Sequence, residues 1–303
     1  MKKKPLVSVI MPCYNAVKFI GEAIESILLQ SLPDLELIII DDGSTDSTAE
    51  VVERINEERI RYVRFDKNKG NYFARNRGLD LATGRYVAMA DADDIAYMDR
   101  LKIQFEHMEA HPEVMVLGGQ CDVVDEEGSY IGELRRPLAY DEIRVALLQN
   151  NFVHQPTLMF RRELVEKGYC YDESFPCSGD YDFVYRISRF FRIVNLDKVI
   201  VKYRRHPRQL STAKRDLQHQ YADRVRECQL VDFGMVFSGR ELEIHQKLAK
   251  GNYLDNKELW TAERWINSLL EHNMDNDIYD RKCFYEFCQR LSAAAVRKNH
   301  LGK

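Results

Sequence analysis

Apolar and polar positions alternate in blocks along the N-terminal third of the chain. Continuous apolar runs with the length of buried strands occur at residues 6–11, 35–40, 60–65 and 86–90. Segments with helical spacing of apolar side chains lie between them, at residues 18–30, 47–56 and 71–82. Strands that alternate with helices through short connections predict an α/β fold, in which helices cover a parallel sheet.

The pattern becomes mixed between about residues 95 and 212. It predicts helices at 99–110, 141–149 and 180–191, and extended segments at 114–132, 156–160 and 199–204. Only helical segments follow, near residues 213–233, 239–250, 257–273 and 277–297. We therefore predict two parts, an α/β domain at 1–212 and an all-helical C-terminal extension at 213–303.

The predicted extension is too apolar for a free linker. It carries both tryptophans and several other aromatic residues, including Trp260, Trp265, Phe284, Tyr285 and Phe287. Such residues pack in a core more often than they line a ligand site. We expect the extension to pack against the first domain or to form a homodimer contact.

Composition places the chain among soluble globular proteins. Of its 303 residues, 45% are apolar and 30% are charged, which allows a large core. The formal net charge of −4 gives no electrostatic case for nucleic acid as a partner. The seven cysteines are odd in number and scattered without a CxxC pair, which favours reduced thiols in a cytosol.

Targeting signals are weak in this sequence. The apolar run at 6–11 ends at Pro12 and is too short for a signal peptide, and no uncharged apolar stretch approaches the roughly 18 residues of a membrane span. We therefore expect a cytoplasmic protein. Basic ends at residues 2–4 and 297–303 suggest peripheral contact with anionic lipid at the inner face of the membrane, although a solvated terminus is the simpler explanation.

An acidic run follows the apolar segment at 86–90, with Asp91, Asp93 and Asp94 in close succession. In an extended chain Asp91 and Asp93 would point to the same side. Ligands of open α/β sheets bind at the carboxyl ends of the strands, and divalent cations such as Mn2+ or Mg2+ accept carboxylate oxygens. The run predicts a metal site, against the alternative that Asp is common in turns after strands.

A set of motifs in fixed order resembles family 2 glycosyltransferases. The motifs are VSVIMPCYN at 7–15, AIESILLQ at 23–30, IDDGSTD at 40–46, NKG at 68–70, ARNRG at 74–78, DADD at 91–94, SGDYD at 178–182 and YRRH at 203–206. The resemblance covers about residues 5–212 and nothing after about 215. It implies a GT-A fold (Rossmann-like, with a mostly parallel central sheet flanked by helices), a nucleotide-sugar donor, a divalent metal and inversion at the anomeric carbon.

By this resemblance, the site residues lie at the strand ends. Asp42 would accept a hydrogen bond from a uracil ring and Asp93 would bind the metal. The remaining nucleotide-sugar residues would be Pro12 and Tyr14 around the base, Asn68, Gly70 and Arg75 near the nucleotide, and Asp91 near the ribose or metal. Each residue also has a plain explanation: Asp42 in a turn, Ser44 or Asp46 as a helix cap, Tyr14 in packing, and Arg75 as a solvated helix charge.

The resemblance also assigns residues to the reacting end of the donor. His206 would lie over the diphosphate as a further metal ligand, with Arg205 nearby, unless both belong to a surface basic cluster with Lys202, Arg204 and Arg208. His154 matches a position on the acceptor side in some relatives.

Asp180 is the predicted catalytic base. It stands where a helix is expected to begin, so a role as helix N-cap is the alternative, and Asp182 is a nearby rival. The family motif usually reads Glu-Asp at this point, and here Gly179 replaces the Glu.

We therefore predict an inverting, metal-dependent hexosyl- or N-acetylhexosaminyl-transferase. It would move a sugar from a nucleoside diphosphate, UDP by preference, to a hydroxyl of a carbohydrate or lipid-linked acceptor in bacterial surface-polysaccharide synthesis. A sugar nucleotidyltransferase would carry a Gly-rich phosphate loop after the first strand, and residues 12–16 contain no glycine. A sugar-nucleotide or glycan-binding module without transfer activity is the non-enzymatic alternative, which the Gly179 departure keeps open.

Overall fold

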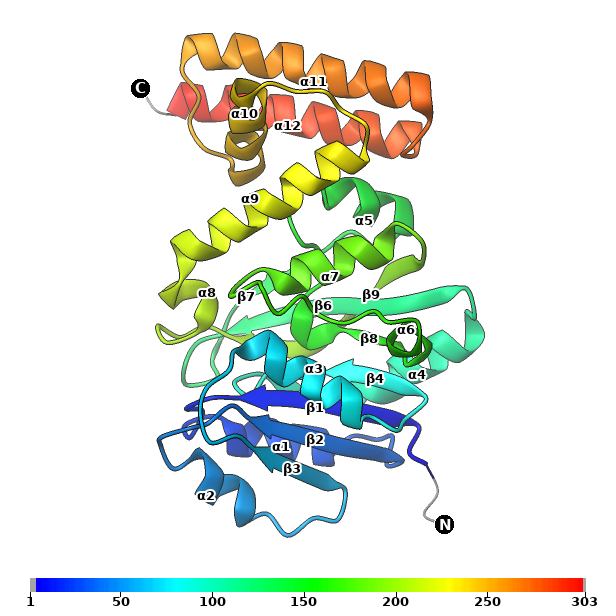
Figure 1. Ribbon diagram of the computed structural model, residues 1–303, viewed down its shortest axis with the longest axis vertical. Helices are drawn as coiled ribbons and strands as arrows, with labels where there is room; N and C mark the ends of the chain where they lie inside the picture. Colours follow the sequence, from blue (N-terminus) through cyan, green and yellow to red (C-terminus); the bar gives the residue numbers. More distant parts are fainter. Residues whose placement is uncertain (1–3, 302–303) are drawn as a thin grey trace. The chain divides into compact units, whose positions relative to one another are not determined.

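The structure is a computed structural model that describes residues 4–301, and the side chains of Ser211 and of residues 297–301 are not described. Backbone contacts divide the chain into two compact units. The sheet unit comprises Met1–Leu138 and Val153–Gln218, and the helical unit comprises Ala139–Phe152 and His219–Lys303. Figure 1 labels the helices and strands of both.

A nine-stranded sheet forms the centre of the sheet unit, in the order β3-β2-β1-β4-β8-β6-β9-β5, with β7 paired to β6. The strands are β1 (Val7–Cys13), β2 (Leu35–Asp41), β3 (Ile60–Arg64), β4 (Tyr86–Met89), β5 (Ile95–Ala96), β6 (Val114–Val124), β7 (Tyr130–Leu134), β8 (Met159–Arg161) and β9 (Arg192–Arg204).

The sheet is parallel from β3 through β4 and mixed beyond. The pairs β2–β3, β1–β2 and β1–β4 are parallel, because a helix carries the chain back between successive strands. Later pairs alternate: β4–β8, β6–β8, β6–β7 and β5–β9 are antiparallel, while β6–β9 is parallel. The α/β prediction is confirmed, and the sheet is more mixed than the sequence suggested.

Helices cover the sheet and lie in the connections between its strands. They are α1 (Ile20–Leu28), α2 (Thr48–Glu53), α3 (Asn71–Leu81), α4 (Arg100–Ala110), α6 (Glu163–Glu166), α7 (Gly179–Ser188), α8 (Leu210–Ala213) and the 3₁₀ turn η1 (Gln155–Thr157). The extended segment expected at 156–160 is therefore divided between η1 and β8, since Pro156 has no N–H for a strand ladder. The four-residue helix α6 was not predicted.

The helical unit has its own apolar core. It contains α5 (Tyr140–Ala146), most of α9 (Arg215–Asp232), α10 (Gly239–Lys250), α11 (Asn256–Asn276) and α12 (Arg281–Leu301). Trp265, Phe284 and Phe287 are buried, whereas Trp260 and Tyr285 are exposed. Val145 and Leu148 belong to this core. The segment 139–152, which the sequence placed in the first domain, therefore packs with the C-terminal helices.

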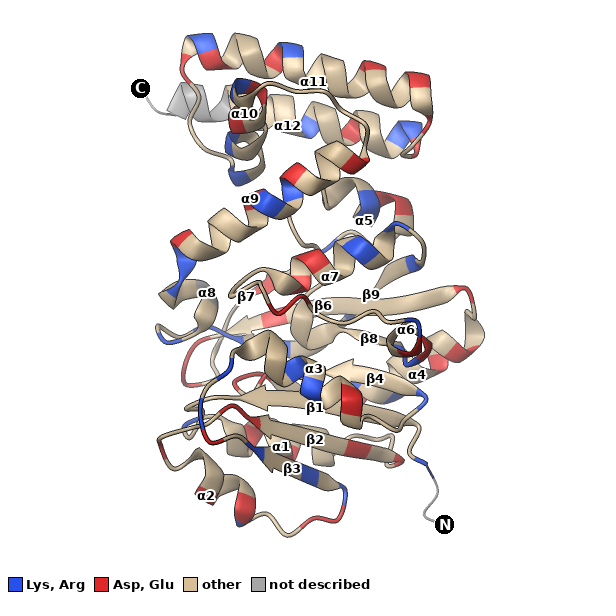
Figure 2. Cartoon of the chain, in the orientation of Figure 1, with Lys and Arg blue, Asp and Glu red and all other residues tan. Residues whose placement is uncertain are grey.

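The charged residues are spread over the helices and loops (Figure 2), and the cysteines form no disulfide bonds among the described residues. Figure 2 shows Lys and Arg interleaved with Asp and Glu on the helices and loops, while β1 and β4 carry no charged residue. All seven cysteines are free thiols. Within residues 4–301, no helix is both long and apolar enough to cross a bilayer.

Candidate functional site

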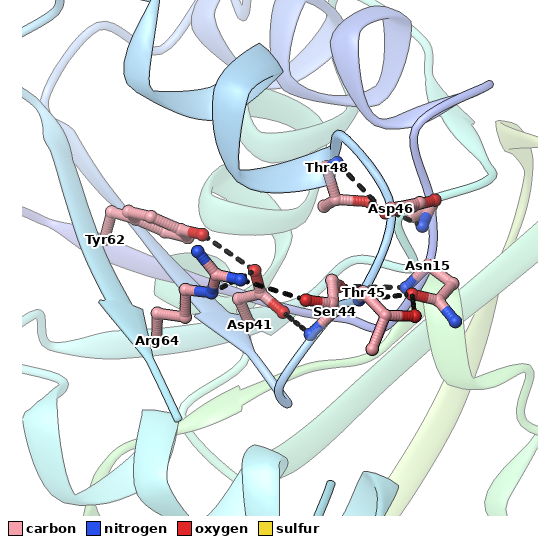
Figure 3. A network of polar contacts seen from close by, with 9 residues as sticks. Asn15, Asp41, Ser44, Thr45, Asp46, Thr48, Tyr62 and Arg64 are labelled. Atoms are coloured by element: carbon pink, nitrogen blue, oxygen red, sulfur yellow. Dashed lines mark hydrogen bonds and ion pairs between the residues drawn. The ribbon is translucent and has the colours of Figure 1, made fainter. Parts of the chain in front are cut away.

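The loop after β2 is held by buried hydrogen bonds (Figure 3). Asp41 is fully buried, and its Oδ1 accepts the backbone N–H of Ser44 (2.8 Å) while its Oδ2 accepts the hydroxyl of Tyr62 (2.7 Å). Asp46 Oδ1 accepts the N–H of Thr48, the first residue of α2, at 3.0 Å, but the N-cap position of that helix belongs to Ser47. These acidic residues therefore shape the loop.

The β1 and β2 loops are tied together through Asn15 (Figure 3). Its N–H donates to Ser44 Oγ (2.9 Å) and its Oδ1 accepts the N–H of Thr45 (2.8 Å). Asn15 has φ 51°, in the left-handed region that Asn tolerates. Tyr14 beside it is 48% exposed, so its ring is not packed in the core. Pro12 lies buried at the end of β1.

Asp42 links β2 to the start of α3. Its Oδ1 accepts the N–H of Lys69 and its Oδ2 that of Gly70, both at 2.8 Å, and the residue is 2% exposed. Burial raises the pKa of Asp42, and the two amide hydrogen bonds oppose that rise. Gly70 has φ 106°, a conformation that favours glycine, and Asn68 in the same loop is exposed. Each carboxylate oxygen retains a lone pair for a further donor.

Arg75 lies on α3 and is buried, so the alternative of a solvated helix charge is wrong. Its Nη2 donates to Asp91 Oδ1 at 2.6 Å. Burial opposes the charged form, but the Asp91 carboxylate raises the pKa of Arg75. Its Nε and Nη1 are buried and have no hydrogen-bond partner in the described chain. Buried donors of this kind are costly unless a ligand or water accepts from them.

The acidic run 91–94 forms a turn, and this corrects the expectation that an extended chain aligns Asp91 with Asp93. Strand β4 ends at Met89, and the N–H of Asp94 donates to the carbonyl of Asp91 (3.3 Å). The carboxylates nevertheless share one region. Burial raises the pKa of Asp91, Arg75 opposes this, and the charges of Asp93 and Asp180 add to the rise.

Asp94 points inward, toward a cavity of about 10 Å³ that Asp91 and Arg100 also line. Its Oδ1 accepts the N–H of Arg204 (2.8 Å), while its buried Oδ2 has no partner among the residues described. Burial raises the pKa of Asp94 well above its usual value. A cavity of this size holds at most one water and is too small for a substrate. Asp94 therefore has a structural role, in which its carboxylate binds the backbone of Arg204.

Asp93 and His206 face each other, with Asp93 Oδ2 at 2.9 Å from His206 Nε2. The His206 ring lies against Phe19, with centroids 4.9 Å apart. The described residues contain no cluster of three or more His, Cys, Asp or Glu side chains able to hold a metal. The pair fits a divalent cation only if other oxygens, such as those of a diphosphate, complete the coordination.

The alternative that Arg204 belongs to a surface basic cluster is wrong, because Arg204 is only 2% exposed. Its Nε donates to the carbonyl of Asp93 (2.9 Å) and its Nη1 to the carbonyl of Glu126 (2.9 Å), so it supports the loop that presents Asp93. Arg205 is exposed, and its N–H donates to Val124 (2.8 Å).

Asp180 is the second residue of α7, after Gly179, so it is not the N-cap; that position is Ser178. Its Oδ1 accepts the hydroxyl of Tyr72 at 3.2 Å. The rival Asp182 is paired with Arg186 one turn along the helix, at 2.7 Å. No motif in the sequence selects Tyr72, because its role depends on which face of α3 meets α7.

His154 contacts a different part of the sheet unit. Its Nε2 lies 3.0 Å from Arg136 Nε and 2.7 Å from Arg136 Nη2, and its ring centre is 5.8 Å from that of Tyr203. Burial, together with the Arg136 charge, lowers the pKa of His154 to about 3, so the ring is neutral and accepts from Arg136. Its predicted place on the acceptor side remains a prediction.

Comparison with known sequences gives clear relatives. The model of the family described as Glycosyl transferase family 2 matches residues 8–169. An uncharacterized glycosyltransferase of Haemophilus influenzae is 32% identical over 237 residues, which cover 75% of this chain and 73% of that protein. A putative teichuronic acid biosynthesis glycosyltransferase of Bacillus subtilis, TuaG, is 47% identical over 107 residues, 35% of this chain and 42% of that protein.

Solved structures share the fold at low sequence identity. S. aureus TarS in complex with UDP-GlcNAc has a TM-score of 0.58 and 19% identity, covering 98% of this chain and 92% of that one. Mannosyltransferase PcManGT from Pyrobaculum calidifontis, in complex with GDP-Man and Mn2+, has a TM-score of 0.60 and 21% identity, covering 100% of this chain and 89% of that one. The likeness confirms the predicted GT-A fold with its helical C-terminal region.

Sheet, strand-edge carboxylates and relatives together define a glycosyltransferase. The chain belongs to glycosyl transferase family 2.

Proposed function

We propose that the protein is an inverting glycosyltransferase that moves a sugar from UDP to an acceptor hydroxyl, with Asp180 as the base. The observation that carries the proposal is the polar cluster at the carboxyl edge of the sheet, where α3 donates from Arg75 to Asp91 at 2.6 Å and from Tyr72 to Asp180 at 3.2 Å. Inversion requires a base on the face opposite the leaving group. Asp180 comes from α7, Arg75 from α3 and Asp91 from the turn after β4, so these groups approach from different parts of the chain.

The donor would lie along the ends of β1, β2 and β4. Asp42 has lone pairs left for the N–H of a uracil ring. The exposed ring of Tyr14 and the buried Pro12 would flank the base, and Asn68 and Gly70 would border it. The two unpartnered nitrogens of Arg75, Nε and Nη1, would donate to the nucleotide sugar, and Arg205 would lie near the diphosphate. The TarS structure with UDP-GlcNAc supports UDP; PcManGT, which binds GDP-Man, makes GDP the rival nucleotide.

Asp93 and His206 would hold a Mn2+ or Mg2+ ion together with diphosphate oxygens. A cation at this place offsets the negative charge that grows on the leaving diphosphate. The Mn2+ in PcManGT supports the proposal.

The acceptor would be a carbohydrate or a lipid-linked carbohydrate, with His154 on its side of the site. The teichuronic acid biosynthesis relative supports a setting in surface-polysaccharide synthesis. Transfer of a hexosyl or an N-acetylhexosaminyl group is part of the same proposal; UDP-GlcNAc in TarS and GDP-Man in PcManGT match the two types.

Homodimer formation through the helical unit, membrane contact and a cytoplasmic location remain predictions. Several large apolar side chains of that unit are exposed, including Val236, Trp260 and Met274, which supports a contact with a second copy. The basic ends lie largely outside the described residues, since Lys2, Lys3 and the side chains of 297–303 are not described.

Asp180→Asn tests the reaction. The change keeps the size of the side chain and an acceptor for Tyr72 but removes the base, so transfer should fall roughly a hundredfold or more. The affinity for UDP-sugar, measured by calorimetry, should stay nearly unchanged. Asp182→Asn is the matched control, because it removes a carboxylate of the same helix that is already paired with Arg186.

Two results would contradict the proposal. One is near wild-type transfer by Asp180→Asn, and the other is a product that keeps the anomeric configuration of the donor. A wild-type protein that binds UDP-sugars tightly and transfers nothing would favour the binding-module alternative. That alternative is motivated by Gly179, which stands where the family usually has Glu.

A further inference from the structure

Gly179 leaves room for the ring of Tyr72. A Cβ atom built on Gly179 would lie 2.7 Å from Cε2 and 2.8 Å from Cζ of Tyr72, closer than real Cβ contacts come. All of its nearest neighbours belong to this one ring. The absence of a side chain at 179 and the presence of the tyrosine at 72 are therefore one packing solution, in which α3 meets the first turn of α7.

The phenol of Tyr72 makes two hydrogen bonds to consecutive residues of α7. Its oxygen accepts the N–H of Gly179 at 2.8 Å, and its O–H donates to Asp180 Oδ1 at 3.2 Å. The N–H of Gly179 belongs to the first turn of the helix, where amides lack partners within the helix. One phenol therefore caps α7 and orients the carboxylate of Asp180.

The ring of Tyr72 is rigidly placed. Tyr72 is 5% exposed and stacks on Tyr171, with centroids 5.6 Å apart, and Tyr171 stacks on Phe183 of α7 at 4.3 Å. Burial, reinforced by the Asp180 charge, raises the pKa of Tyr72 well above its usual value. The phenol therefore keeps its proton and remains a donor at neutral pH.

We propose that Tyr72 is a positioning residue for Asp180, which it holds in the orientation that takes the proton from the acceptor. This inference rests on the proposed function. In the reaction, the acceptor oxygen forms the new bond to the anomeric carbon, the bond from that carbon to the diphosphate oxygen breaks, and the acceptor proton passes to Asp180. Tyr72 touches none of the reacting atoms and acts through the Asp180 carboxylate alone.

Tyr72→Phe removes the hydroxyl and keeps the ring, its stack and the occupied space at Gly179. Released UDP is measured from UDP-GlcNAc with Mn2+, with water as the acceptor. A carboxylate that is no longer held should lower kcat roughly 10- to 100-fold, while KM for the donor stays within about threefold. Tyr171→Phe is the matched control: it removes a buried hydroxyl of the same stack, whose partner is Gln155 Nε2 (2.8 Å), and kcat should hardly change.

Gly179→Ala offers a second route to the same contact. Its Cβ must push the Tyr72 ring aside, so kcat should again fall. In the Tyr72→Phe background the hydroxyl contact is already absent, and the alanine should add little to the loss. The two changes should therefore be strongly non-additive in kcat.

Amide hydrogen exchange reads the contact without any turnover. In Tyr72→Phe the N–H of Gly179 loses its acceptor and should exchange faster, while Tyr171→Phe should leave its exchange unchanged. Any of three results overturns the inference. They are a wild-type kcat in Tyr72→Phe, an equal loss of kcat in Tyr171→Phe, and unchanged exchange of the Gly179 N–H in Tyr72→Phe. If the wild type releases no UDP or GDP from any sugar nucleotide, the proposed function fails, and the exchange data decide alone whether Tyr72 holds this turn.

Discussion

Adjacent carboxylates have different partners at the strand ends of this protein. Asp41 accepts hydrogen bonds from Ser44 and Tyr62, whereas Asp42 accepts two backbone N–H groups just before α3. Asp93, by contrast, has a second donor atom beside it in His206 Nε2 at 2.9 Å. Of these residues, Asp93 is the one whose partner is itself a potential metal ligand.

Asp93→Asn should weaken Mn2+-dependent binding of UDP. The change removes the negative charge that a divalent cation requires, and it keeps the shape of the side chain. Calorimetry with UDP, with and without Mn2+, would show a loss of the metal-dependent part of the affinity of roughly tenfold or more, the scale of lost metal-site groups. Asp197→Asn, a change at an exposed carboxylate, is the control. Equal metal-dependent affinity in both variants would rule out Asp93 as a ligand.

At the scale of elements, α3 organises the candidate site. Its start binds Asp42 through Gly70, and farther along it presents Tyr72 to Asp180 and Arg75 to Asp91. The helix approaches β1 closely, since a Cβ on Gly78 would lie 2.3 Å from Ile10 Cγ2. The position of three groups therefore depends on one small residue at a helix–sheet contact.

Gly78→Ala should destabilise the sheet unit by about 1–3 kcal/mol, the usual scale for overpacking a core. Gly21→Ala on α1 is the matched control, because its Cβ would meet only Val51 Cγ1 at 3.7 Å. Alanine is the better helix former, so this control should be neutral or slightly stabilising. Urea unfolding followed by circular dichroism measures both variants. Equal midpoints for the two would show that α3 can move away from β1 without penalty.

His245 should make the helical unit sensitive to acid. It is buried, its Nδ1 accepts from Trp265 Nε1 (3.2 Å) and its Nε2 donates to the carbonyl of Leu148 (3.1 Å). Burial lowers its pKa to about 4, despite the Leu148 hydrogen bond. Below about pH 6.5 His245 takes up a proton in the unfolded chain but stays neutral in the folded one. The free energy of unfolding should therefore fall by ~1.4 kcal/mol per pH unit down to about pH 4.

His245→Gln should remove much of this slope, because an amide can serve both hydrogen bonds and does not titrate. Both tryptophans lie in the helical unit, so their fluorescence reports its unfolding in urea at pH 7 and pH 4.5. The wild-type midpoint should fall more than the variant midpoint between these pH values. Parallel falls would mean that other groups carry the acid sensitivity.

At the scale of the whole molecule, one segment of the first half folds with the last third of the chain. Val145 and Leu148 join the core of the helical unit, and Arg226 Nε and Gln229 Nε2 donate to the carbonyls of Gln149 (2.8 Å) and Leu147 (2.9 Å). Removal of the C-terminal helices would therefore leave an apolar segment uncovered in the middle of the remaining chain.

A chain that ends at Gln218 should aggregate or change its oligomeric state, since apolar surface without a partner promotes association. Replacement of both Val145 and Leu148 by Ser in the shortened chain should restore part of its solubility. Light scattering and size-exclusion chromatography measure both proteins. A shortened chain with the size and thermal midpoint of the full protein would contradict this reading and would favour the boundary first predicted at 212.

The strand–helix alternation, the family and the polar residues that follow the strands can all be read from the amino-acid sequence. Periodicity and motifs are local, so they are readable without knowing which elements touch. The packed fold was needed to show that residues 91–94 form a turn, that Arg204 is buried, and that 139–152 belongs to the helical unit. It also paired Tyr72 with Asp180 across 108 positions. Such pairings follow from which helix faces meet in the packed core, and no local pattern of apolar and polar residues carries that information.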